Sequence, residues 1–357
     1  MNIKDIKELD LFVFAGQSNM MGASALPPIK TDFTDLAFEY KYMPKLRTNK
    51  TGEFVKAQNP CGEFHYVDLA LAYGKRLADL KYKSNLSNYT QNTYFCPAMS
   101  NSQMPFVEQS ESQTCPAASL PPYFATEYAK FNHACVYSHV CKGSAKIVHF
   151  FTEQMVSEYN ALINLHNLKH GIVYKKLEHV FGGGKAFDDK YNSMLSDFIN
   201  LCPNAKINNK CFFFLQGESD SDNSYVEYKL KLRVLFEHIQ ALGITHFFIL
   251  RVGFWDNENI INVIKAQEDF CLENQNCYII SRAPSLVEHP FTNKENWWIE
   301  EPSEEYQNCR DNLVNGNNHF NEKAMQLFAT NSAKNVHRVL YLGLEPQVEK
   351  ENIKLLK

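Results

Sequence analysis

Five short runs of apolar residues punctuate the chain, and each is apolar nearly throughout instead of alternating with polar residues. They cover residues 10–15, 134–140, 211–215, 246–252 and 277–281. Strands of a parallel sheet have both faces covered, so their sequences lose the polar alternation of half-exposed strands. The five runs therefore predict five buried, parallel strands.

Between these runs, apolar residues recur at spacings of three and four, which is typical of helices with one buried face. The pattern predicts helices over residues 65–81, 186–201, 224–241, 258–273 and 321–340. Residues 151–168 can form a further helix, and FGGGK at 181–185 reads as a flexible connection. Alternating strands and helices predict an α/β fold, a three-layer α/β/α sandwich around a mainly parallel five-stranded sheet.

Two stretches interrupt this alternation. Residues 83–125 are rich in Ser, Asn, Gln, Pro and Tyr, and residues 283–312 contain Trp297 and Trp298 without a clear period. We interpret both as insertions in a single domain that spans residues 1–357. The two tryptophans can stack on a sugar ring or close the edge of a core, and we favour the second role.

Charge and composition exclude several classes of partner. The 357 residues carry a net charge of −4, without a basic stripe, so we expect no nucleic-acid partner. No apolar window is long enough to cross a bilayer, so we expect no membrane partner. The first residues lack the apolar core of a signal peptide, which favours a cytoplasmic location.

Ten cysteines are present without a Cys-x-x-Cys pair, so we expect neither a zinc ribbon nor a dithiol redox site. Cys135, Cys211 and Cys277 lie in predicted strands and are interpreted as small buried hydrophobic residues. Cys96 and Cys115 lie in a polar stretch and can pair only in an oxidising compartment.

The first predicted strand runs directly into GQSNMMG, residues 16–22. Gly16 allows a sharp turn, and Ser18 falls near the start of a helical turn. A serine there can cap the helix, or it can act as a nucleophile whose own N–H helps to bind an oxyanion. On the serine alone, the capping role is the commoner one.

Other predicted strands end in the same way. The third strand runs into QGESD, residues 216–220, and the second into Lys142, Gly143 and Ser144. After the fifth strand, His319 stands in a loop that leads into the last helix. Because parallel strands end at one edge of a sheet, a hydroxyl, amide donors and an imidazole are expected to gather there.

These segments resemble the SGNH hydrolase superfamily, and more narrowly its sialate O-acetylesterase and carbohydrate esterase family six branch. The resemblance also includes Tyr191-Asn192 and Lys265-Ala266-Gln267. It implies a flavodoxin-like sheet, a serine esterase that needs no metal or cofactor, and an acetylated carbohydrate substrate. It implies that Ser18 is the nucleophile and His319 the general base.

The resemblance also assigns the residues around this pair. The N–H groups of Ser18 and Gly143 and the amide of Gln216 would form the oxyanion hole. A carboxamide suits that role because it is a neutral donor that does not titrate. Gln17 and Asn19 would support the turn or contact the substrate.

The sequence departs from the family pattern at the acid. The family usually has an aspartate three residues before the histidine, and here that position is Gly316, preceded by Asn315. Glu218 can orient His319, Asp311 can do so from a reshaped loop, or the site can work as a Ser–His pair. We prefer Glu218, because it follows a strand end at the same rim. Asp220 is expected to cap the helix that begins near Asn223.

The resulting hypothesis is a carbohydrate O-acetylesterase that works through an acyl-serine. Two alternatives stay open. The same serine can transfer its acyl group to another sugar, or the chain can be a carbohydrate-binding relative that has lost catalysis. The identity of the sugar, the position of its acetyl group and the oligomeric state do not follow from the sequence.

Overall fold

A computed structural model describes residues 2–21, 33–41, 52–57, 119–141, 144–179, 183–253, 259–287, 297–299, 304, 319–349 and 353–355. The predicted helix over 65–81, the body of the first insertion, and Cys96 and Cys115 lie outside these residues. Of the cysteines that are described, Cys135, Cys211 and Cys277 are buried, as predicted.

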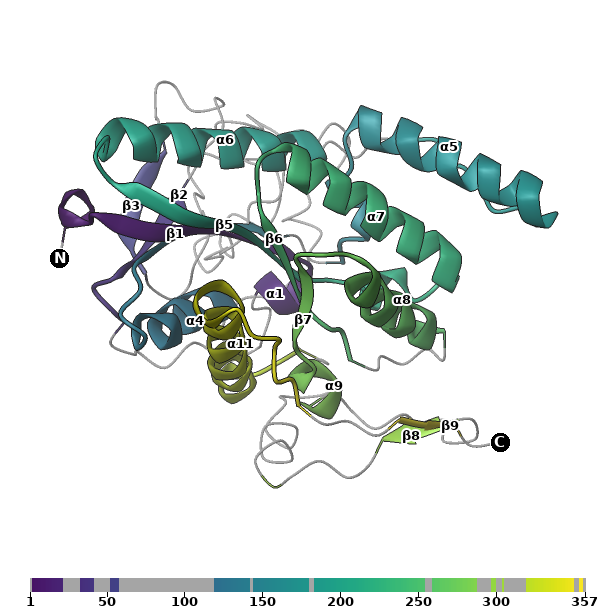
Figure 1. The fold of residues 1–357 in the computed structure, drawn as a ribbon. Helices are drawn as coiled ribbons and strands as arrows, with labels where there is room; N and C mark the ends of the chain where they lie inside the picture. Colours follow the sequence, from purple (N-terminus) through teal and green to yellow (C-terminus); the bar gives the residue numbers. More distant parts are fainter. Residues whose placement is uncertain are drawn as a thin grey trace, which may run out of the picture.

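Seven strands form the central sheet, in the order β3-β2-β4-β1-β5-β6-β7 (Figure 1). Neighbours are parallel except β3, which runs antiparallel to β2. Their bounds are β1 Glu8–Gly16, β2 Ala37–Lys41, β3 Glu53–Lys56, β4 Cys135–Cys141, β5 Lys206–Leu215, β6 His246–Leu250 and β7 Cys277–Ser281. All five predicted strands are confirmed, but the predicted number of strands was wrong by two.

The two additional strands lie at one edge of the sheet and have mixed sequences. β2 reads AFEYK and β3 reads EFVK, so charged residues break any apolar run. β2 is nevertheless buried, and its Tyr40 hydroxyl donates a hydrogen bond to Asp197 at 2.5 Å. Short strands with interior charges do not produce the signal of a continuous apolar run, which explains why they were missed.

Helices cover both faces of the sheet (Figure 1). On one face, α4 and α11 pack against each other; on the other lie α6, α7 and α8, and α5 packs on α7. Their bounds are α4 Leu120–Ala129, α5 Glu153–His170, α6 Gly183–Leu201, α7 Tyr225–Ala241, α8 Ile260–Glu273 and α11 Glu322–Leu342. Within the described ranges, none of the helices combines the length and apolar character needed to cross a bilayer.

The predicted helices over 186–201, 224–241, 258–273 and 321–340 are confirmed as α6, α7, α8 and α11. Residues 151–168, for which a helix was one possibility, form α5. α4 was not predicted, because its residues were assigned to the first insertion. Pro121 and Pro122 lie in its first turn, which tolerates proline, and Leu120 and Phe124 are fully buried. The first insertion therefore ends before Ser119.

The prediction of a flexible connection at 181–185 was also wrong for residues 183–185, the part of it that the structure describes. Gly183 and Gly184 begin α6, and a Cβ atom on Gly184 would lie 2.6 Å from the carbonyl oxygen of Phe150. This glycine lets the start of α6 approach η5, a 3-10 helix over Ile147–Phe150.

Short elements complete the described chain. They are η1 Ile3–Asp5, α1 Ser18–Met21, η6 Glu218–Asp220, α9 Ala283–Val287, β8 Trp297–Ile299 and β9 Ile353–Leu355. α9 is buried, so the start of the second predicted insertion belongs to the core. β8, which contains both tryptophans, pairs antiparallel with β9 near the C-terminus.

Three consecutive phenylalanines in β5 show how both faces of the sheet are filled. Phe213 points to the α4 side, with its ring centroid 4.9 Å from that of Phe124. Phe212 points the opposite way, 5.5 Å from Phe187 of α6, and Phe214 does the same, 5.6 Å from Phe150. Side chains of a strand alternate between faces, so an unbroken apolar run supplies two cores at once.

Candidate active site

The predicted site lies at the point where the strand order reverses. β4 lies beside β1 on one side. The next strand in the chain, β5, lies beside β1 on the other side. Gly16 pairs with Cys141 of β4 and with Leu215 of β5, so the three strands end side by side. In open α/β sheets, ligands bind outside the carboxyl ends of the strands at such a reversal.

Ser18 begins the four-residue helix α1 and is almost fully buried, 7% exposed. Gly16 precedes it because there is no room for a side chain: a Cβ atom would lie 2.1 Å from the oxygen of Leu215 and 2.7 Å from Cβ of Met20. The Gln17 N–H donates to the same Leu215 oxygen at 3.2 Å. The glycine is thus required for close packing of the turn against β5.

Hydrogen bonds join this turn to two segments that are distant in sequence. The Gln17 side-chain oxygen accepts from the Ser219 N–H at 3.1 Å. The Asn19 side chain donates to Glu218 Oε1 at 2.7 Å, and its own oxygen accepts from the Phe320 N–H at 3.4 Å. Asn19 therefore bridges the loop after β5 and the residue that follows His319.

Glu218 is fully buried and follows Gly217, whose φ of 150° is unfavourable for other residues. A Cβ atom on Gly217 would also lie 2.7 Å from Cγ1 of Val263. The Glu218 Oε1 atom is bonded to Asn19, whereas Oε2 has no hydrogen-bond partner among the described residues. Burial raises the pKa of this carboxyl, and the nearby Asp220 acts in the same direction.

Both polar atoms of the Gln216 side chain are hydrogen-bonded. Its amide nitrogen donates to the oxygen of Ala145 at 2.9 Å and to Asp220 Oδ2 at 2.5 Å. Its amide oxygen accepts from the Tyr228 hydroxyl at 3.1 Å. Because a carboxamide has two N–H bonds, both are already used in this arrangement.

Asp220 does not cap the following helix, contrary to the prediction. α7 begins at Tyr225, and its cap is Ser224, whose hydroxyl accepts from the Glu227 N–H at 3.2 Å. Asp220 instead accepts from the Ile147 N–H at 2.7 Å as well as from the Gln216 amide. Burial raises its pKa, and the positive charge of Lys231 opposes this effect.

His319 lies three residues before α11, the helix that the sequence predicted to follow it. It is half-buried and precedes Phe320, which is fully buried, and Asn321, which caps α11 by accepting from the Ala324 N–H at 2.9 Å. Four further residues of the predicted site or its alternatives lie outside the described residues: Gly143, Asp311, Asn315 and Gly316.

Two residues that received no role from the sequence support the β5 turn. Gln267 of α8 donates to the backbone oxygen of Gln216 at 2.8 Å and accepts from the Val252 N–H at 3.1 Å. Tyr228 of α7 donates to the same Gln216 oxygen at 3.0 Å. Gln267 belongs to a segment that carries the resemblance, but only the structure shows what it contacts.

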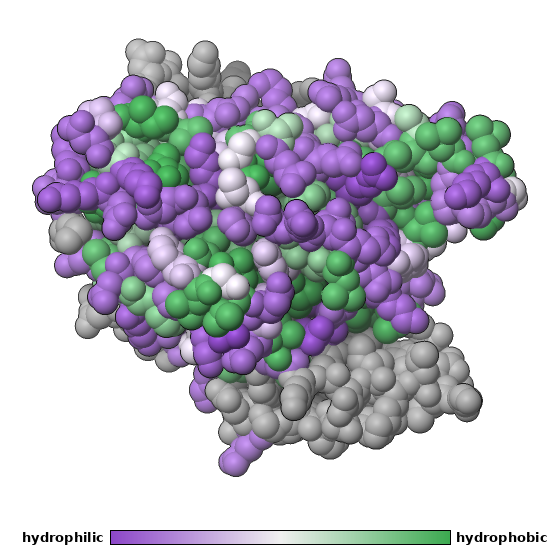
Figure 2. All heavy atoms as spheres, in the orientation of Figure 1, coloured by the Kyte–Doolittle hydropathy of each residue, from purple (hydrophilic) through white to green (hydrophobic). Residues whose placement is uncertain are grey.

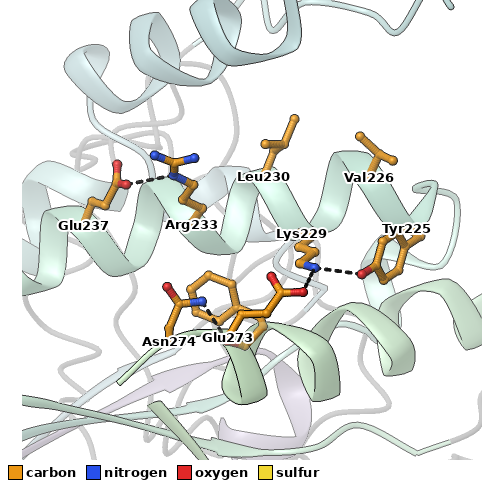
Figure 3. A pocket seen from close by; sticks show the side chains of 9 residues that line it. Tyr225, Val226, Lys229, Leu230, Arg233, Glu237, Glu273 and Asn274 are labelled. Carbon is orange, nitrogen blue, oxygen red and sulfur yellow. Dashed lines mark hydrogen bonds and ion pairs between the residues drawn. The ribbon is translucent and has the colours of Figure 1, made fainter. Parts of the chain in front are cut away.

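Other candidate sites are weaker. In the described part of the chain, no three His, Cys, Asp or Glu side chains are grouped to bind a metal ion. A groove of about 370 Å³ lies between α7 and α8, and none of the predicted site residues lines it (Figure 3). Its cations are already paired, Lys229 with Glu273 at 2.6 Å and Arg233 with Glu237 at 2.8 Å.

No protein-family model matches the sequence, and no curated protein matches it. Solved structures with a similar fold include a carbohydrate acetylesterase from Xanthomonas citri, at 12% identity and a TM-score of 0.45; 94% of this chain and 57% of that chain are covered. A protein from Arabidopsis thaliana matches at 10% identity and a TM-score of 0.46, with 92% and 97% covered. NanS matches at 11% identity and a TM-score of 0.46, with 94% and 98% covered.

The chain thus spans 57% of the length of the Xanthomonas citri enzyme. Similarity at these identities and TM-scores concerns the fold alone.

Proposed function

We propose that this protein is a serine esterase that removes acetyl groups from carbohydrates. The observation that carries the proposal is the double hydrogen bond of Asn19, to Glu218 and to the Phe320 N–H. Through it, the residues next to Ser18 and His319 and the carboxyl of Glu218 are tied together at the strand-order reversal. The sequence motifs around these residues resemble those of the SGNH hydrolase superfamily.

In the proposed reaction, the Ser18 hydroxyl attacks the ester carbonyl carbon while His319 accepts its proton. The resulting oxyanion is held by the N–H groups of Ser18 and Gly143, and each such donor typically lowers the barrier by about 3 kcal/mol. The intermediate then expels the sugar oxygen, which takes the proton from His319. Water activated by His319 cleaves the acetyl-serine and releases acetate.

Gln216 enters this proposal as a support for the turn. To donate to an oxyanion, its amide would have to leave Ala145 or Asp220, so the predicted oxyanion role is not favoured by these contacts. An ordered turn is itself useful, because a small displacement of the reacting groups reduces the rate strongly.

Glu218 is the proposed acid of the site, acting through Asn19. Its carboxylate orients the Asn19 amide, whose oxygen in turn holds the backbone beside His319. Negative charge on Glu218 would also stabilise the imidazolium that forms in the transition state, because Coulomb interactions are strong at buried sites.

The test compares the full chain with Ser18→Ala, using p-nitrophenyl acetate first and then acetylated sialic acids and acetylated xylo-oligosaccharides. We expect Ser18→Ala to lose about 10³-fold or more in kcat/KM. Ser332→Ala is the matched control, because Ser332 is buried in α11 and its hydroxyl has no hydrogen-bond partner among the described residues. Equal rates for wild type and Ser18→Ala would refute the proposal.

A fluorophosphonate probe gives an independent readout. It reacts with activated serine hydroxyls, so we expect one label per chain, located at Ser18 by peptide mass spectrometry. A folded chain that takes up no label would favour the alternative of a carbohydrate-binding protein without catalysis. Release of free acetate, measured beside acetylated sugar products, separates hydrolysis from transfer to another sugar.

A further inference from the structure

The helix α5 and the segment that returns beside it, residues 153–179, form an arm that leaves the body of the molecule (Figure 1). Only the first half of α5 packs on α7. Its buried residues are Met155, Tyr159 and Ile163, spaced by four so that they share one face. Beyond Ile163, no residue of the arm is buried up to residue 179.

The outer half of the arm is held in one shape by two asparagines. Asn160 donates to the backbone oxygen of Leu177 at 2.9 Å and accepts from its N–H at 2.8 Å. Two helical turns later, Asn167 makes the same pair of bonds with Tyr174, both at 3.0 Å. The two asparagines therefore hydrogen-bond the returning segment to the helix at two points.

The end of this fastened arm is apolar and exposed. Leu165 is 64% exposed, Leu168 84%, Ile172 45% and Val173 89%. Leu165 and Leu168 are three residues apart, so they share a face of α5 that differs from the face packed on α7. Figure 2 shows apolar residues gathered over this part of the molecule. Soluble proteins rarely group exposed aliphatic side chains without an interaction partner.

The charges around the apolar end are mainly positive. Residues 164–179 contain Lys169, Lys175 and Lys176, all exposed, against one acidic residue, Glu178. The whole chain is acidic, with a net charge of −4, so this local excess of lysine has the opposite sign. Aliphatic side chains surrounded by lysines are typical of protein surfaces that bind anionic membranes.

We propose that the outer end of the α5 arm docks onto the surface of a lipid bilayer that carries anionic headgroups. A bilayer accepts a projecting end without a complementary shape. The side-chain hydrogen bonds of Asn160 and Asn167 also satisfy backbone groups of Leu177 and Tyr174. This lowers the free-energy cost of removing those backbone groups from water.

This inference revises the expectation of no membrane partner. That expectation was based on the absence of an apolar stretch long enough to cross a bilayer, whereas docking at the surface requires only a few aliphatic side chains and nearby positive charge. It is also independent of the proposed esterase activity, because the arm contains none of the predicted site residues.

The experiment is co-sedimentation of the full chain with vesicles of phosphatidylcholine alone or with about 30% phosphatidylserine. We expect binding to the anionic vesicles, weak binding to the neutral ones, and a clear loss of binding between about 0.05 M and about 0.5 M NaCl. Absence of binding to the anionic vesicles at low salt would overturn the proposal.

Variants then assign the binding to the arm. Leu168→Ser combined with Val173→Ser is expected to weaken binding about tenfold or more, and Lys175→Glu combined with Lys176→Glu by a similar factor. Leu272→Ser is the matched control, because Leu272 of α8 is 83% exposed and lies outside the arm. Equal binding of the arm variants and the control would refute the assignment.

Size-exclusion chromatography with light scattering tests the main rival occupant, a second copy of the chain. We expect the same mass for wild type and the Leu168→Ser, Val173→Ser variant in the absence of vesicles. A dimer that the two substitutions dissociate would assign the apolar end to self-association and overturn the membrane proposal. Circular dichroism of each variant shows whether a loss of binding comes from unfolding.

Discussion

Two buried carboxyl groups lie at opposite ends of the central strands, and they differ in the number of side-chain hydrogen bonds that their oxygen atoms accept. Asp10, near the start of β1, accepts from the hydroxyls of Tyr128 and Tyr341 and from the amide of Asn209, each at 2.7 Å. Glu218, beyond the end of β5, accepts one side-chain hydrogen bond, from Asn19, and its Oε2 has no partner among the described residues.

The difference separates a structural carboxyl from a candidate functional one. A buried carboxylate that accepts from three donors has replaced its hydrogen bonds to water by hydrogen bonds within the protein. Asp10 thereby links α4, β5 and α11 to β1. A buried carboxyl with one side-chain donor is a less favourable place for a charge, and such groups are common where a charge acts during a reaction. Substitutions at both residues test this difference.

The largest expected effect is on stability, at Asp10. Asp10→Ala leaves two hydroxyls and an amide without their acceptor, so the free energy of unfolding should fall by about 3–5 kcal/mol. Urea denaturation measures this loss. Esterase activity per folded molecule should stay within about twofold of wild type. A loss below about 1 kcal/mol would contradict the structural role.

The next effect concerns the turn that directs Glu218 into the core. Gly217→Ala combines an unfavourable φ with an overlap against Val263, so we expect a loss of about 3 kcal/mol in the free energy of unfolding. Gly243→Ala is the matched control: its φ is 79°, but an added Cβ meets no heavy atom within 4 Å. It should cost about 1 kcal/mol, and thermal melts of the two variants side by side decide the comparison.

The third effect is on rate, at Glu218 itself. Glu218→Gln keeps an oxygen that can accept from Asn19 but removes the negative charge, so kcat should fall about 100-fold, equivalent to about 2.7 kcal/mol. Stability at neutral pH should be unchanged or higher, because a buried charge is removed. Full activity of Glu218→Gln would show that its charge has no part in the reaction.

The smallest effect is the pH dependence of stability. Burial raises the pKa of Glu218 above its usual value of 4.5, so the folded chain retains a proton that the unfolded chain has already lost. Its contribution to stability is therefore present at low pH and is lost as the pH rises from about 4.5 to the raised pKa, by about 1.4 kcal/mol per unit of elevation.

Unfolding free energies of wild type and Glu218→Gln over a pH series isolate this contribution. The stability of wild type relative to the variant should decline as the pH increases, because Asp220 titrates in both proteins and cancels. A constant difference between the two proteins would contradict a raised pKa for Glu218.

Much of the fold could be predicted from the sequence, because its central strands carry unbroken apolar runs. CFFFL alone places side chains on both faces of the sheet, and that is enough to predict helices on each side. β2 could not be found in this way, because Glu39 interrupts it and its burial depends on β4 beside it. α4 was missed because it follows a long polar stretch of sequence, and that stretch lies outside the described residues.

The candidate site could be predicted in its residue types but not in its connections. The sequence indicated a serine, a carboxamide, a glutamate and a histidine at one edge of the sheet. It could not indicate that Gln216 has both N–H bonds engaged, or that Asn19 joins Glu218 to Phe320, because these contacts join residues up to 301 positions apart. The prediction for Asp220 failed because its carboxyl accepts from the Ile147 N–H of η5 and from the Gln216 amide after β5.

The hydrogen bond between Asn19 and Phe320 has a consequence for synthesis. The serine turn leaves the ribosome well before its partner, which lies 301 residues later in the chain. A growing chain therefore carries the reactive hydroxyl long before its surroundings are complete. A chain that terminates before Phe320 lacks this contact, so the proposal predicts no esterase activity from such truncated molecules.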